Sequence, residues 1–190
     1  MQLTKTLVTE PLQRSEPRTF CELVEQYQRP LYALAYDLTG NHHDAEDLSQ
    51  EVFIKAYRGV SGFRGEAQLY SWLYRIAVNT YLNKRRKKAL RFRQLWDDFS
   101  QAPRDHAPQR GPEEHLEADA IRQHVDAALK TLSPRERSAF VLRHYQNLSL
   151  KEVAAVMEVA EGTVKSLLFR AMQKLRTSLA FYREDLGLPS

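Results

Sequence analysis

The chain has 190 residues, a hydrophobic fraction of 43% and a formal net charge of +4. This hydrophobic content is enough for folded cores and excludes wholesale disorder. A single cysteine, Cys21, excludes an internal disulfide bond and suits a reducing compartment. No stretch approaches the roughly 20 apolar residues that a membrane-spanning helix needs. We therefore expect a cytoplasmic protein of one or two small domains.

Composition along the chain predicts an all-α fold of two small helical domains joined by a flexible linker. Only 7 glycines and 8 prolines occur, which leaves long stretches rich in helix-forming residues. Residues 1–17 are predicted to be a disordered tail. Helical blocks are expected over 18–91 and 113–185, followed by a tail at 186–190. The prolines, glycine and aspartates between them predict a linker at 92–112.

Local signals predict where helices begin and end in the first block. Pro30 suits the first turn of a helix, where its missing N–H costs little. Asn41, followed by Asp44, can cap the next helix, which we expect over 42–57. The two glycines of the 61–65 segment predict a loop, and a long helix follows that loop.

The second block contains two capping-box patterns and a helix-turn-helix pattern. Ser133 is followed by Pro134 and then Glu136, and Ser149 is followed by Glu152, so both serines predict helix starts. Over residues 150–174 a short helix, a tight break and a longer helix follow one another. Such an arrangement places its second helix in the DNA major groove.

A helical wheel divides the second helix of this motif into an apolar stripe and a polar face. The predicted packing stripe is Val164, Leu168, Ala171, Leu175, Leu179 and Tyr182. The candidate DNA-contacting residues are Thr163, Lys165, Ser166, Phe169, Arg170 and Gln173. Hydroxyl, guanidinium and amide groups can donate to base edges and phosphates, and a phenylalanine can contact a thymine methyl. An ordinary amphipathic helix with one exposed phenylalanine is the alternative.

An acidic and apolar stripe lies on the helix predicted over 42–57. Asp47, Gln50, Glu51 and Ile54 follow the i, i+3, i+4, i+7 spacing of one helix face. An acidic edge beside an apolar side chain suits docking against a basic helical surface. A simple solvated face is the alternative interpretation.

Aromatic and cationic residues follow the predicted loop, a composition typical of proteins that bind single-stranded nucleic acid. Rings stack on unpaired bases while cations contact phosphates. The candidate contacts are Phe63, Arg64, Tyr70, Trp72, Arg75, Asn79, Lys84 and Arg86. Trp72 shares a helix face with Leu69, Leu73 and Ile76, so it is equally a candidate for the core. The basic run that begins at Lys84 is alternatively a solvated helix end or a nonspecific polyanion patch.

Together these segments resemble the extracytoplasmic-function sigma factors, from about Phe20 to Arg176. The string DAEDLSQEVF at 44–53 is similar to the family's polymerase-binding helix. Residues 63–73 are similar to the loop and helix that open and read the −10 promoter element. Residues 148–176 are similar to the domain that reads the −35 element, and EGTVKS at 161–166 is the most specific string.

The resemblance implies a promoter-directing subunit of RNA polymerase with no catalysis, cofactor or metal of its own. The 18–91 block would be the region 2-like domain and the 113–185 block the region 4-like domain. The stripe of Asp47, Gln50, Glu51 and Ile54 would contact the clamp of the largest polymerase subunit. The second domain would contact the flap of the second-largest subunit. Further implied partners are promoter DNA and an anti-sigma factor, which in this family often holds the protein at the inner membrane.

The sequence departs from the family pattern at three positions. Leu167 and Met172 stand where relatives commonly carry arginines, which predicts an altered −35 contact. Glu158 occupies a turn position usually given to glycine, so it must adopt a less favourable backbone region.

Two other classes of protein compete with this interpretation. An operator-binding regulator would use only the helix-turn-helix and would bind duplex DNA without polymerase. A helical interaction adaptor with incidental basic patches would make no sequence-specific DNA contact. An enzyme is disfavoured, because the sequence contains no phosphate-binding glycine loop, metal-ligand spacing or nucleophile–base pattern.

Overall fold

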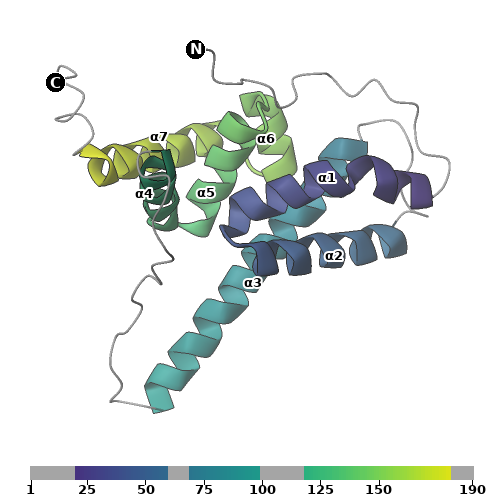
Figure 1. Ribbon diagram of the computed structural model, residues 1–190, viewed down its shortest axis with the longest axis horizontal. Coiled ribbons are helices and arrows are strands. Elements are labelled where there is room, and N and C mark those ends of the chain that lie inside the picture. Colours follow the sequence, from purple (N-terminus) through teal and green to yellow (C-terminus); the bar gives the residue numbers. More distant parts are fainter. Residues whose placement is uncertain (1–19, 60–68, 99–117, 181–190) are drawn as a thin grey trace.

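The computed structural model describes residues 20–59, 69–98 and 118–180, and the side chains of all of these except 94–98 and 118–123. These ranges contain helices and no strand, which confirms the all-α prediction (Figure 1). None of their helices is long and apolar enough to cross a bilayer. The elements are α1 (Phe20–Thr39), α2 (His42–Gly59), α3 (Leu69–Asp98), α4 (Ala118–Lys130), α5 (Pro134–Phe140), the π-helical turn η2 (Val141–Tyr145), α6 (Leu150–Met157) and α7 (Glu161–Ser178).

Several sequence predictions fall outside the described residues. These are the two tails, the 61–65 loop with Phe63 and Arg64, and Tyr182. Residues 99–112 of the predicted linker lie outside them too. Residues 92–98 are described and form the end of α3, which continues as a helix to Asp98, so the linker prediction is wrong for this part.

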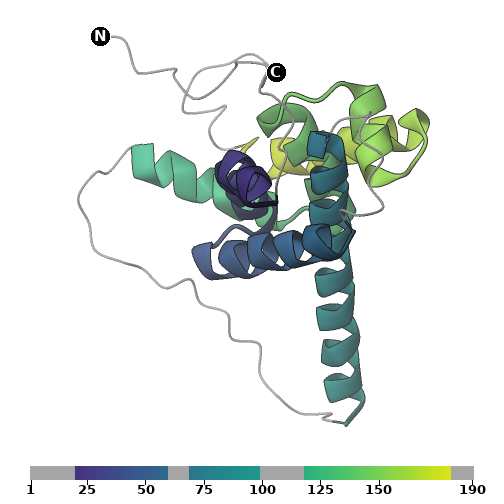
Figure 2. The same cartoon turned by 90° about the vertical axis from the view of Figure 1, so that its right-hand side faces the viewer.

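Helices α1, α2 and α3 build the first half of the molecule around a leucine-rich centre. Leu31, Leu34 and Leu38 of α1 are almost completely buried, as are Leu48 and Val52 of α2. Their spacing of three or four residues places each set on one helix face, which explains why the two helices pack side by side. The second half of α3 leaves this core and projects from the molecule (Figure 2).

Pro30 lies inside α1, so the prediction of a helix start at this residue is wrong. A proline there removes one backbone donor from the helix. Buried residues on both sides share a face and outweigh this loss, since Leu23 and Tyr27 precede the proline and Leu31 and Leu34 follow it. Tertiary packing therefore stabilises a continuous helix at Pro30, although local preference alone would end the helix there.

The predicted helix caps are confirmed. The Asp44 backbone N–H donates to Asn41 Oδ1 at 2.8 Å, immediately before the first turn of α2. At α5 the Ser133 N–H donates to Glu136 Oε2 at 2.8 Å, and at α6 the Ser149 N–H donates to Glu152 Oε2 at 2.7 Å. Both serine side chains accept the reciprocal bond, so both capping boxes are complete.

The two halves of the molecule share one hydrophobic core. Tyr74 and Val78 of α3 belong to the same buried cluster as Leu142, Val153 and Val156 from the second half. A separate smaller cluster joins α4 to α7. The two predicted domains are therefore closed against each other, an arrangement that the linker composition did not indicate.

Polar bonds reinforce this closed arrangement at the C-terminal end of α1. The Arg137 Nε and Nη2 groups donate to the Asp37 carbonyl oxygen at 2.9 and 2.8 Å. Tyr74 Oη donates to Gln146 Oε1 at 2.8 Å, and Gln146 Nε2 donates to Asp37 Oδ2 at 3.1 Å. Gly40 adopts φ +78°, and a Cβ there would come within 3.1 Å of Arg137 Nη2. Both the positive φ and the close approach of the guanidinium favour glycine at this position.

The Asp37 carboxyl makes this interface sensitive to pH. Desolvation raises the pKa of Asp37 to about 6, and the Gln146 hydrogen bond and Arg137 charge offset only part of that effect, while Asp126 adds to it. Because the pKa is raised, the stability linked to this group is fully present below its ordinary pKa of 3.8 and is lost as pH rises through about 6.

We expect Asp37→Asn to stabilise the folded chain at about pH 7.5, because the amide oxygen keeps the bond from Gln146 without a charge. The gain should be on the order of 1 kcal/mol after solvent screening, measured as a rise in Tm. The variant should also flatten the dependence of Tm on pH between about pH 4 and 6. An unchanged slope would contradict this assignment.

Candidate functional site

The predicted stripe on α2 forms an exposed surface with one apolar side chain. Asp47 and Gln50 are exposed, Glu51 is half-buried, and the Ile54 side chain is 52% exposed although it is large and apolar. Two cations fix the Glu51 carboxylate: Lys55 Nζ lies 2.8 Å from Oε1 and Lys84 Nζ lies 3.0 Å from Oε2. The stripe is thus a surface of polar and anionic groups around an isoleucine.

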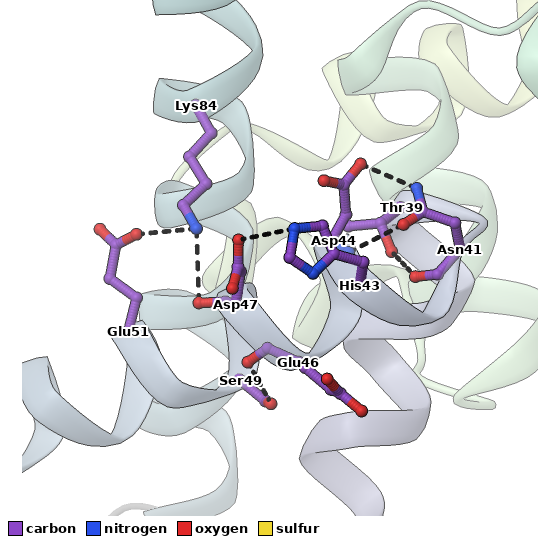
Figure 3. Close-up of polar contacts among 9 residues, drawn as sticks. All are labelled: Thr39, Asn41, His43, Asp44, Glu46, Asp47, Ser49, Glu51 and Lys84. Carbon is purple, nitrogen blue, oxygen red and sulfur yellow. Dashed lines mark hydrogen bonds and ion pairs between the residues drawn. The ribbon is translucent and has the colours of Figure 1, made fainter.

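Electrostatics keep Glu51 ionised on this surface. Desolvation raises the pKa of its carboxyl, but the hydrogen bonds and charges of Lys55 and Lys84 more than reverse this, so the net pKa is below the ordinary value. Lys84 also reaches the Asp47 carbonyl oxygen at 3.4 Å, and His43 lies 3.9 Å from the Asp47 carboxylate (Figure 3). Lys84, which was predicted to contact the −10 element, therefore lies against the α2 surface.

The predicted −10 residues that the structure describes lie along α3 and differ in exposure. Tyr70 and Trp72 are half-buried; Tyr70 packs against Tyr74 with ring centroids 4.0 Å apart and the rings tilted by 38°. Trp72 packs against a buried cluster that includes Leu23 and Leu73, which favours the core alternative for this ring.

Arg75 and Asn79 lie one turn apart on α3, and both meet the same carboxylate from the second half of the chain. Arg75 Nη1 is 3.6 Å from Glu158 Oε1, and Asn79 Nδ2 donates to Glu158 Oε2 at 3.4 Å. These two candidate DNA contacts are therefore engaged within the protein itself.

The basic run forms an arm at the projecting end of α3. Every residue from 83 to 93 is exposed, and residues 84–93 include seven lysines and arginines and no acid. Arg86 is exposed on this arm, whereas Tyr70 and Trp72 are half-buried near the start of α3. The basic run consequently lies further along the helix than these two rings, and among the described cationic candidates Arg75 alone lies close to them in sequence.

All six candidate residues on α7 are exposed, with Phe169 at 65%. Four of them line a shallow open hollow: Lys165, Ser166, Phe169 and Arg170. Ser166 Oγ donates to the Gly162 carbonyl oxygen at 3.0 Å, so it presents an acceptor outward. The face offers cations, a ring and polar groups to a partner.

The buried stripe of α7 differs in part from the predicted one. Val164, Ala171 and Leu175 are buried as expected, but Leu167 is also buried at 4% exposure, whereas Leu168 and Leu179 are only half-buried. Leu167 therefore packs in the core and does not belong to the outer face.

Glu136 connects the α5 cap to this outer face. Its carboxylate accepts from Lys174 Nζ at 2.7 Å, and its Oε1 lies 3.8 Å from Arg170 Nε. Desolvation raises the pKa of Glu136, but the bonds from Lys174 and Ser133 lower it below the ordinary value. An ionised, buried carboxylate thus orients two α7 cations.

Comparison with known proteins assigns the family. The family model described as Sigma-70 region 2 matches residues 23–91, and Sigma-70, region 4 matches residues 122–175. The RNA polymerase sigma-H factor of Pseudomonas aeruginosa is 34% identical, over 90% of this chain and 92% of its own length. The ECF RNA polymerase sigma-E factor of Escherichia coli K12 is 35% identical, over 92% of this chain and 93% of its own length.

The chain belongs to the sigma-70 family, in its extracytoplasmic-function group. It is an alternative sigma factor that directs transcription from specific promoters, with region 2 in α1–α3 and region 4 in α4–α7. The sigma factor SigE of Mycolicibacterium smegmatis is 39% identical over 86% of this chain, which spans only 63% of that relative's length.

Solved structures agree with this assignment. The sigma factor RpoE of Bartonella quintana, in complex with the anti-sigma factor NepR, has a TM-score of 0.64 and 28% identity, over 85% of this chain and 96% of its own. CnrH, in complex with the cytosolic domain of CnrY, has a TM-score of 0.58 at 22% identity, over 85% of this chain and 87% of its own, and supports the fold alone.

Two residues of this sigma factor acquire importance only in the structure. Glu158 was expected at a special turn position, and its φ of +54° and ψ of +47° confirm the left-handed conformation. Nothing in the sequence indicated that its side chain reaches α3. Glu136 was recognisable as a cap, but its contact with Arg170 depends on how α5 packs against α7.

Proposed function

We propose that the α2 surface docks on the clamp of the largest subunit of core RNA polymerase. Ile54 would enter an apolar site there, and Asp47, Gln50 and Glu51 would pair with basic residues. The support is the combination of a half-exposed isoleucine with the Glu51 carboxylate, which is already fixed and ionised. Preorganised charges and a central apolar side chain are the features of a binding hot spot.

In this proposal region 2 opens and reads the −10 element without any catalytic step. Phe63 and Arg64 would capture a flipped base of the non-template strand, together with Tyr70 and Trp72. Arg75, Asn79 and Arg86 would contact bases or phosphates along α3, with Lys84 at the border of the polymerase surface. Stacking contributes roughly 1–3 kcal/mol per base, comparable to the energy needed to unstack one.

Region 4 would insert α7 into the −35 major groove and contact the flap of the second-largest subunit. The observation that carries the DNA-binding proposal is the outer face of α7, where all six predicted residues are exposed over a buried apolar back. Thr163, Lys165, Ser166, Phe169, Arg170 and Gln173 would supply the contacts. Two reading sites on one chain would give bivalent affinity and a preferred promoter spacing.

An anti-sigma factor is the proposed regulator of this chain. The support is that a similar structure, that of RpoE, was solved in complex with the anti-sigma factor NepR. We infer that it would bind the free sigma factor and keep it from polymerase.

Transcription from a promoter library with a randomised −10 element tests the region 2 assignment. Arg75→Ala together with Asn79→Ala should flatten the base preference at −10 and lower transcript yield about tenfold, since each lost base contact is worth roughly 1–3 kcal/mol. Preference at −35 should not change. Arg29→Ala, an exposed cation on α1, is the matched control. Unchanged −10 preference in the double variant would contradict the assignment.

A further inference from the structure

Glu158 is a region 4 residue whose side chain contacts two proposed −10 contacts of region 2. It ends α6 in the left-handed conformation, and its backbone N–H donates to the Ala154 carbonyl oxygen. From this position its two carboxylate oxygens lie 3.6 Å from Arg75 Nη1 and 3.4 Å from Asn79 Nδ2. A glycine would close the helix equally well, so capping alone does not use the carboxylate.

The groups that Glu158 contacts are those that a nucleic acid would need. A guanidinium and an amide, one helical turn apart, are donors suited to phosphates or base edges. A carboxylate offers them anionic oxygens, as a phosphate would. While Glu158 holds this place, DNA must compete with its carboxylate for both side chains.

Arg75 is incompletely satisfied in the closed chain. Its Nε is buried and, among the described residues, has no hydrogen-bond partner. A buried donor without a partner is unfavourable, so the position that Arg75 occupies beside Glu158 is not its most favourable one. Exposure to water or to DNA would satisfy the same group.

Other contacts hold the two halves together. The shared core of Tyr74, Val78, Val153 and Val156, with the Arg137–Asp37 bonds, accounts for the closed arrangement. The Arg75–Glu158 pair is about half exposed, with side chains 42% and 57% accessible. Such a pair contributes little attraction. Glu158 therefore occupies the donors without being the main support of the interface.

We propose that the free chain inhibits its own −10 recognition, with Glu158 as an internal competitor for DNA at Arg75 and Asn79. Core polymerase, by separating region 4 from α3, would withdraw the carboxylate and release both donors together. The inference rests on the proposed −10 role of these two residues. The ligand that Glu158 would exclude from Arg75 and Asn79 is unpaired DNA.

Binding of short single-stranded DNA of mixed sequence to the free chain tests the proposal. Glu158→Gly and Glu158→Gln should each tighten binding about two- to fivefold, the range expected for a half-exposed ion pair. Glu161→Gln removes the same charge from the next helix start and should leave the affinity unchanged. In the complex with core polymerase, the Glu158 variants should show no gain over the parent.

Two results would overturn the proposal. One is an affinity gain no larger in the Glu158 variants than in Glu161→Gln. The other is an equal gain in the free chain and in the polymerase complex, which would indicate a general charge effect without masking.

A stability measurement separates this proposal from the proposed function. Glu158→Arg should lower the Tm of the free chain slightly by repelling Arg75, as expected for a half-exposed pair, and adding Arg75→Glu should restore the Tm. Restoration with no −10 defect for Arg75→Ala in the polymerase complex would retain the contact and reject the −10 role. Failure of the charge swap to restore the Tm would reject the contact itself.

Discussion

Ile54→Asp is expected to abolish polymerase binding while leaving the fold intact. The side chain is 52% exposed in the free chain, so its replacement should change Tm little. At the proposed clamp interface the aspartate would be buried without a partner, which costs several kcal/mol. We expect affinity for core polymerase to fall at least about 100-fold, measured by fluorescence anisotropy of labelled protein.

Leu90→Asp is the matched control for this experiment. Leu90 is 53% exposed on the projecting part of α3, so both substitutions place the same charge at an equally exposed apolar residue. The control should bind polymerase like the parent chain. Equal losses in both variants, or none in Ile54→Asp, would show that the α2 surface is not the docking site. Glu51→Gln should weaken binding only a few-fold, since it keeps the shape and loses one charge.

Arg170→Ala should weaken recognition of the −35 element about 10- to 100-fold and relax sequence preference at one base pair. The residue is exposed on the α7 face beside Phe169, and Glu136 lies 3.8 Å from its Nε. A specific arginine–base contact is worth about 1–3 kcal/mol. Selection from a randomised −35 library, sequenced with each variant, measures both the yield and the preference.

Two other α7 cations serve as comparisons that distinguish a base contact by Arg170 from a general charge effect. Lys165→Ala should reduce affinity uniformly across sequences and lower the salt dependence by about one phosphate contact. Arg176→Ala, exposed in the last turn of α7, should have little effect. If Arg170→Ala lowered yield without altering preference, the residue would be a phosphate contact and its assignment as a base contact would fail.

Features set by neighbouring residues were predictable from the sequence. The caps at Asn41, Ser133 and Ser149 depend on side chains within three positions of the backbone they satisfy, and each was predicted. The left-handed conformation of Glu158 followed from the family resemblance, in which glycine usually occupies this turn position. The exposed face of α7 followed from helical periodicity, because its amphipathic pattern is regular.

Features set by distant residues were not predictable in this way. Pro30 lies within a helix because buried leucines and a tyrosine on both sides pack together. The bonds from Arg137 and Gln146 to Asp37 span 100 and 109 positions, and no local pattern encodes them. Cys21 is exposed although the apolar residues Leu23 and Val24 follow it closely in the sequence. The occupation of Arg75 and Asn79 follows from the same long-range closure.

Run-off transcription with purified core polymerase on a promoter library, with and without this chain, tests the central claim most directly. We predict transcripts that require the chain, come from promoters with two sequence blocks at a fixed spacing, and disappear with Ile54→Asp. Absence of any chain-dependent transcript, together with tight binding of duplex DNA in the absence of polymerase, would contradict the account and favour an operator-binding regulator.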